Sequence, residues 1–179
     1  MCISGIGPLL LLAAVARAGT LDVPGQYATI QAALDAAALG DTIVVQPGTY
    51  LEALSFPTYS VTLTAPGGPD VTVVDASGLG TSAVTIPNVE IVPTLVEGFT
   101  ITGGEGTLVN SERWGGGVVV SGQGPVTLRN CRITGNTALV GYGGGISVGN
   151  SLGSGGKLTL EDCEVSGNVA SSGGGLAAF

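Results

Sequence analysis

The sequence contains no histidine and few charged residues of either sign. Lys and Arg together number five, against 13 Asp and Glu, which gives a net charge of −8 over 179 residues. Without histidine, zinc chemistry based on that ligand is excluded within this chain. A negative surface repels nucleic acid, and five cations are too few for a basic patch. These absences exclude nucleic acid as a partner.

Long apolar runs are also missing. The apolar stretch near the N-terminus, residues 9–15, is too short to cross a bilayer as a helix. The small-x-small site Ala16-Arg17-Ala18 follows it, so we predict a secretory signal peptide over residues 1–18, cut after Ala18. The first residues carry no Lys or Arg, so an internal fragment with an arbitrary start is the alternative. We expect a secreted or cell-surface protein rather than a transmembrane one.

Glycine and β-branched residues are what the chain has in quantity. Glycine occupies 32 positions, and Thr, Val, Ile and Leu recur throughout. Apolar residues are too plentiful for a disordered chain, and the glycines lack the three-residue period of collagen. The mixture indicates many short strands joined by tight corners.

Three stretches repeat at a fixed offset of 32 residues. They are residues 96–103, 128–135 and 160–167, and each is followed by a triple glycine, at 115–117, 143–145 and 173–175. A period of this length indicates a solenoid, in which each unit covers the hydrophobic face of the next. Residues 32 apart should therefore stack. The expected columns are Phe99, Cys131 and Cys163; Ile101, Ile133 and Val165; and, on the outside, Glu97, Arg129 and Glu161.

The corners of each unit can be placed from the alternation of apolar residues. Val126 and Leu128 face the same way as Cys131 and Ile133 only if the chain turns at 129–130. A second corner at each Gly-Asn pair and a third at each triple glycine give three strands per coil. We therefore predict an all-β fold, a right-handed single-stranded parallel β-helix of five or six coils.

A short helix should precede the coils. Apolar residues recur at helical spacing between Thr29, a suitable N-cap, and Gly40. We assign residues 19–40 to a lead-in strand and a capping α-helix, and residues 41–179 to the β-helix coils. The chain ends within an expected strand, so we predict a C-terminally incomplete helix whose uncapped last coil allows end-to-end self-association.

Residues 24–37 and 40–50 resemble the opening of right-handed parallel β-helix proteins of the pectin-lyase-like fold, which includes secreted pectin-degrading enzymes. The later units, with triple glycines and Ile-Thr-Gly-Asn corners, resemble repeats of polymorphic outer-membrane and adhesin-type β-helix proteins. The resemblance implies the fold. It does not imply an activity, because this fold hosts enzymes and non-catalytic adhesins alike.

The acidic and basic residues are scattered rather than clustered. Enzymes of the resembled kind need grouped carboxylates or a basic residue beside the substrate. Arg129 and Arg132 instead fall in outward columns between acids, where they should form ion pairs. No catalytic residue is indicated. No cofactor is indicated either, although a calcium site in the 104–113 loop is left open.

Two positions indicate ligand binding. Trp114 and Tyr142 each precede a triple glycine, so their rings should stack, either as a stabilising column or as an exposed platform for a sugar ring. Cys131 and Cys163 would lie about 4.8 Å apart in adjacent coils. We favour small buried thiols there over a disulfide, because parallel side-chain vectors fit the disulfide torsion poorly.

The leading hypothesis is a secreted or cell-surface β-helix with a structural, adhesive or carbohydrate-binding role, its partners being polysaccharide or cell-surface components. The alternative is a lyase, hydrolase or esterase acting on pectin-like acidic polysaccharide, with an active site that is incomplete here or lies beyond residue 179.

Overall fold

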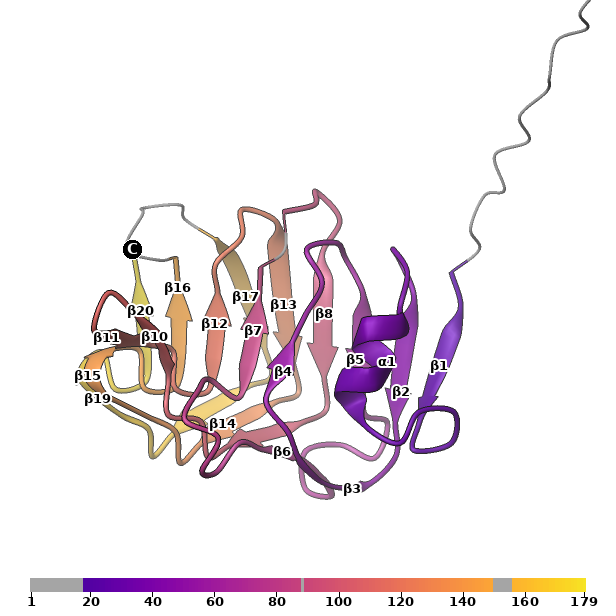
Figure 1. Ribbon diagram of the computed structural model, residues 1–179, viewed down its shortest axis with the longest axis horizontal. Coiled ribbons are helices and arrows are strands. Elements are labelled where there is room, and N and C mark those ends of the chain that lie inside the picture. Colours follow the sequence, from indigo (N-terminus) through magenta and orange to yellow (C-terminus); the bar gives the residue numbers. More distant parts are fainter. Residues whose placement is uncertain (1–17, 88, 150–155) are drawn as a thin grey trace, which may run out of the picture.

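The protein is a β-solenoid of about four turns with one short helix at its N-terminal end (Figure 1). The computed structural model describes residues 18–87, 89–149 and 156–179. The predicted signal peptide therefore lies, except for Ala18, outside the described residues. In three of the sheets, successive strands come from successive turns of the chain, so these sheets run along the stack. The predicted parallel stack is confirmed, and its right-handed sense stays a prediction.

Three parallel sheets form the walls of the stack, and a smaller fourth sheet is added near its C-terminal end. Sheet A contains β1 (Thr20–Val23), β2 (Thr42–Val45), β5 (Thr62–Thr64), β8 (Thr94–Glu97), β13 (Pro125–Arg129) and β17 (Lys157–Glu161). Sheet B contains β3 (Gly48–Leu51), β6 (Thr72–Asp75), β9 (Thr100–Thr102), β14 (Arg132–Thr134) and β18 (Glu164–Ser166). Sheet C contains β4 (Leu54–Ser55), β7 (Val84–Ile86), β12 (Val118–Val120), β16 (Ile146–Val148) and β20 (Leu176–Ala178). Sheet D contains β10 (Thr107–Val109), β11 (Glu112–Trp114), β15 (Thr137–Tyr142) and β19 (Val169–Ser172).

In sheets A and B, the 32-residue offset is the register of the later turns. Ile133 in β14 pairs with Ile101 on one side and Val165 on the other. Arg129 in β13 pairs in the same way with Glu97 and Glu161. In sheets A and B alternate side chains, most of them apolar, point into the stack, where burial of apolar area is the main stabilising contribution. The fully buried side chains include Phe99, Ile101, Leu128 and Ile133.

The corners lie where the alternation of the sequence breaks. Asn130 and Asp162 directly follow β13 and β17. They have φ values of 47° and 52°, in the left-handed region that a sharp turn uses. At the next corner the side chain of Asn136 turns inward and is fully buried. Its Nδ2 donates to Ile101 O at 3.0 Å, and its Oδ1 accepts from Gly104 N at 3.0 Å. Asn168 repeats the arrangement one turn later by donating to Ile133 O at 2.8 Å.

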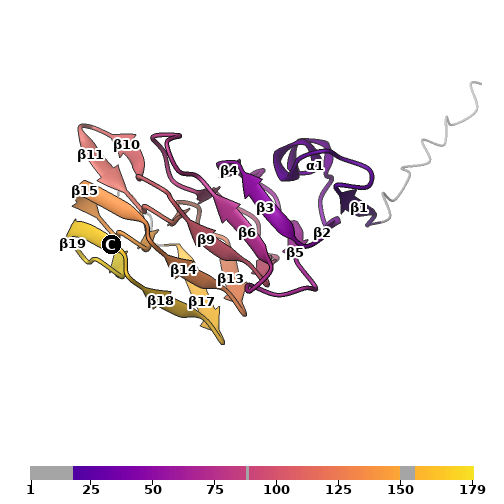
Figure 2. The same ribbon diagram turned by 90° about the horizontal axis from the view of Figure 1, so that it is seen from below.

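Helix α1 (Ile30–Ala36) closes the N-terminal end of the stack (Figure 2). Thr29 is the N-cap, as predicted, and its Oγ1 accepts from Ala32 N at 3.1 Å. The carboxylate of Glu52 accepts from the backbone N–H groups of Ile30 and Gln31, at 3.0 and 2.9 Å. The helix ends at Ala36, four residues before Gly40, because the chain after it is held by the buried Asp41, whose Oδ2 accepts from Ala38 N.

Two expectations about the coils are corrected. The 104–113 loop contains an antiparallel hairpin, β10–β11, whose sheet continues through β15 and β19. The later turns therefore have a fourth strand in place of the predicted three strands per coil. The stack has about four turns rather than five or six, since this hairpin lengthens one turn.

Candidate functional site

The triple glycines join sheet D to sheet C, because β11, β15 and β19 end directly before them and β12, β16 and β20 begin directly after them. Alternation directs Val119 and Ser147 out of the stack, yet they are only 6% and 0% exposed. A Cβ on Gly115 would lie 2.6 Å from Val119 Cγ2, so the glycine backbone itself covers this side chain. Gly115 and Gly143 have φ values of 52° and 66°, which glycine adopts without strain.

The residues before the triple glycines bring three aromatic rings together. Trp114 and Tyr142 pair in register between β11 and β15, with ring centroids 5.0 Å apart. The ring of Phe179 lies 4.8 Å from Trp114 and 5.1 Å from Tyr142, in edge-on contacts. Trp114 is 4% exposed, and its indole Nε1 has no hydrogen-bond partner among the described residues. Of the two predicted carbohydrate-binding residues, Tyr142 alone reaches the surface in this conformation.

A pocket of about 180 Å³ lies beside Tyr142. Its polar lining comes from the carboxylate of Glu112 and from Ser171 and Ser172, and its apolar lining from Val140. Ser171 Oγ donates to Leu139 O at 2.5 Å, which joins β19 to β15 under the pocket. We call this group of residues the Tyr142 pocket. A carboxylate and hydroxyls next to a phenol ring can bind a ligand that carries both hydroxyl groups and an apolar face.

The sheet surface around the pocket is apolar. Leu108, Leu139, Val140 and Val169 on the strands of sheet D are between 52% and 65% exposed. The 32-residue repeat does not predict this surface, because the hairpin β10–β11 that begins it falls outside the repeated stretches. Exposed apolar residues gathered in one region are typical of contact surfaces.

The arginines of the outward columns are held by carboxylates. Arg129 Nε lies 2.7 Å from Glu161 Oε2, and its Nη1 lies 4.0 Å from Glu97. Arg132 lies 3.1 Å from Asp70 and 3.3 Å from Glu164. Hydrogen bonds from Ser166 and Arg132 lower the pKa of the Glu164 carboxyl. Both arginines are thus engaged in ion pairs on the outer surface of the stack.

Arg113, to which the sequence assigned no role, organises the 104–113 segment. Its Nη1 donates to the carbonyl oxygens of Gly80, Glu105 and Gly106 at 2.9, 3.1 and 2.8 Å. Three carbonyl groups, two of them in the 104–113 loop where a calcium site was left open, therefore face a guanidinium. Across the described ranges, no group of three or more Cys, Asp or Glu side chains is arranged to hold a metal ion.

The stacked cysteines are free thiols. Cys131 is buried, and the hydrogen bond to Cys163, together with burial, raises the pKa of its thiol. Cys163 is half-buried, and the same hydrogen bond lowers the pKa of its thiol to about 6.

Neither a protein-family model nor a curated protein matches this sequence. Among the helices of the described ranges, none is long and apolar enough to span a membrane. The structure itself therefore defines the class, a parallel β-solenoid, and the functional assignment depends on its surface.

Proposed function

We propose that the chain is a secreted or cell-surface β-solenoid with a structural or adhesive role, and that it binds carbohydrate through the Tyr142 pocket. The observation that carries the proposal is the partly exposed ring of Tyr142 beside the carboxylate of Glu112 and two serine residues. An aromatic ring can cover the C–H face of a sugar while the carboxylate accepts hydrogen bonds from its hydroxyl groups.

The position of the pocket on a rigid support favours this role. Tyr142 lies on β15, which is paired on both sides, and its ring packs against Trp114 and Phe179. The surrounding apolar residues of sheet D extend the contact surface beyond one sugar unit. A site whose side chains are already held in place loses little conformational entropy when it binds.

The test is a titration of the chain with neutral and acidic oligosaccharides, followed by tryptophan and tyrosine fluorescence. Tyr142→Ala should weaken binding about three- to tenfold, and Tyr142→Phe, which keeps the ring, should retain most of it. Tyr50→Ala on sheet B is the matched control and should bind as the unmodified chain does. Trp114→Ala is not informative here, because Trp114 is buried and its loss would disturb the fold.

Equal affinities for the unmodified chain and Tyr142→Ala would exclude the Tyr142 pocket as the binding site. The same panel tests the alternative of an enzyme acting on acidic polysaccharide. Cleavage of polygalacturonate in the presence of Ca²⁺ would favour the enzyme, whereas binding without cleavage favours the adhesive role. N-terminal sequencing of the secreted chain should begin at Gly19 if the predicted signal peptide is correct.

A further inference from the structure

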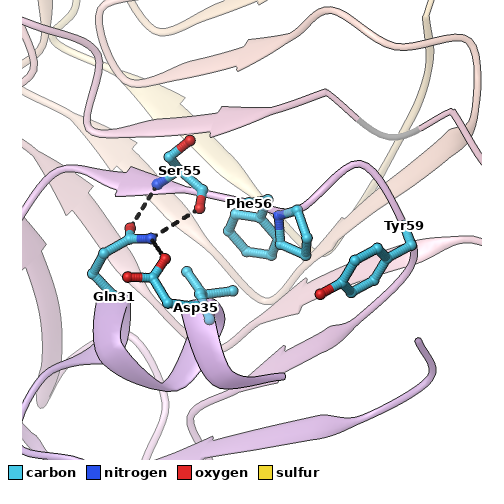
Figure 3. Close-up of a pocket in the computed structure, with 7 residues that line it drawn as sticks. Gln31, Asp35, Ser55, Phe56 and Tyr59 are labelled. Atoms are coloured by element: carbon cyan, nitrogen blue, oxygen red, sulfur yellow. Dashed lines mark hydrogen bonds between the residues drawn. The ribbon is translucent and has the colours of Figure 1, made fainter. Parts of the chain in front are cut away.

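A second pocket lies at the opposite end of the stack, between α1 and the chain that follows β4 (Figure 3). Its volume is about 310 Å³, within the lower part of the range of small-molecule sites, about 300–1,000 Å³. One wall is a single turn of the helix, and the other is segment 55–59. The lining side chains from these two elements include Gln31, Leu34, Asp35, Phe56, Pro57 and Tyr59.

The polar side chains of this wall are fixed by hydrogen bonds within the protein. Gln31 Nε2 donates to Asp35 Oδ1 at 2.7 Å and to Ser55 O at 3.1 Å, and its Oε1 accepts from Ser55 N at 2.8 Å. Figure 3 shows the two bonds between Gln31 and Ser55, which join the helix to the end of β4. Both amide protons of Gln31 are thereby engaged, and one of them holds Asp35 Oδ1.

Tyr59 fixes the other side. Its hydroxyl donates to Ala37 O at 2.7 Å, just beyond the end of α1, and so keeps the ring against the helix. A hydroxyl that donates its only proton can still accept a hydrogen bond. Asp35 and Tyr59 thus offer acceptor oxygens to the pocket, and Leu34, Phe56 and Pro57 supply its apolar lining.

From this combination we infer that the pocket binds one neutral sugar unit. Acceptor oxygens match the hydroxyl groups of a sugar, and the apolar lining matches its C–H face. The lining residues include a carboxylate and no Lys or Arg, so a uronate or a phosphate would be repelled. The inference takes its class of ligand from the proposed function, but it uses residues that the Tyr142 pocket does not share.

Two sugar sites at the two ends of one stack would let a single chain engage two glycans or two positions on one polymer. Linking two weak sites in this way raises the overall affinity without any new contact, provided that both can be occupied together. We call the pocket between α1 and segment 55–59 the cap pocket. It would therefore contribute to adhesion.

The experiment is an NMR titration of the full chain with the methyl glycosides of glucose, galactose and mannose. We expect saturable shifts of the backbone amides of Asp35, Ser55 and Tyr59. Asp35→Asn keeps the shape and the bond to Gln31 but removes the charged acceptor, so binding should weaken about ten- to a hundredfold. Tyr59→Phe should weaken it by a smaller factor. Asp22→Asn, at an exposed acid on β1, is the matched control and should leave binding unchanged.

Absence of saturable shifts at this pocket with all three glycosides would overturn the inference. It would also be overturned if methylammonium or galacturonate produced the shifts and the neutral glycosides did not. Circular dichroism melting of each variant establishes that it is folded. Because Tyr142→Ala leaves the cap pocket intact and Asp35→Asn leaves the Tyr142 pocket intact, loss of one site is distinguishable from loss of the other.

Discussion

In the later turns the strands of sheet A stack at one constant sequence spacing, whereas in the first turns they stack at unequal spacings. Val96, Leu128 and Leu160 are in register at equal spacings of 32 residues. Leu21, Ile43 and Leu63 are equally in register, although 22 and then 20 residues separate them. Stacking therefore requires a common strand geometry but not a common turn length.

The two regions also satisfy their polar groups differently. In the later turns Asn136 and Asn168 make the same bonds one turn apart, and the triple glycines pair backbone to backbone from Gly116 to Gly143 and from Gly144 to Gly173. In the first turns Glu52 and Asp41 reach the helix and lead-in strand from more than 20 residues away. The following substitutions should separate these two modes of stabilisation.

The largest effect should come from Gly144→Ala. A Cβ there would lie 2.5 Å from Val169 O and 2.6 Å from Gly174 O, so the backbone of the stacked turn must move. We expect a loss of about 3 kcal/mol in the free energy of unfolding, measured by urea denaturation. Gly174→Ala is the matched control, because its nearest atom, Asn168 O, lies 3.1 Å away. Equal losses in the two variants would contradict tight backbone stacking at this corner.

Asn136→Ala should have the next largest effect. It leaves Gly104 N–H and Ile101 C=O without their side-chain partner in the interior, which costs about 2 kcal/mol or more. Denaturant unfolding measures the change, and Gln123→Ala, at an exposed corner, should be nearly neutral. If Asn136→Ala were as stable as the control, the buried amide column would not support the later turns.

Glu52→Ala should act on the first turns alone. Two backbone N–H groups of α1 lose their acceptor, and we expect a loss of about 1–2 kcal/mol. Hydrogen exchange should accelerate at residues 30–36 while the amides of β14 and β18 keep their protection. Glu105→Ala controls for the loss of one negative charge. Faster exchange throughout the stack would show that the helix is not a local cap.

Arg129→Glu should give the smallest change. It places three carboxylates in one outward column, so the melting temperature should fall, and high salt should recover part of the loss. Because the side chains are solvent-exposed, the effect should be below that of the other three substitutions. An unchanged melting temperature at low salt would count against the charge column.

The sequence predicts the repeated later turns better than the segments that do not repeat. The repeat predicted the pairing of Ile101, Ile133 and Val165, because equal spacing makes register visible in a single sequence. It could not predict β3 or the β10–β11 hairpin, since neither recurs at that spacing. The cap pocket was also missed, because Gln31 and Ser55 meet only after the helix folds onto β4. The contact of Trp114 with Tyr142 could be predicted because each residue precedes a triple glycine. The burial of Trp114 could not, because it depends on Phe179 and on the fold of sheet D.

The central claim is that residues 32 apart lie on neighbouring strands of one stack. The most direct measurement is the set of backbone nuclear Overhauser effects around Ile133 in the isotopically labelled chain. The account predicts contacts from strand β14 to Ile101 in β9 and to Val165 in β18. Their absence, or contacts that join Ile133 to residues at a different spacing, would contradict it.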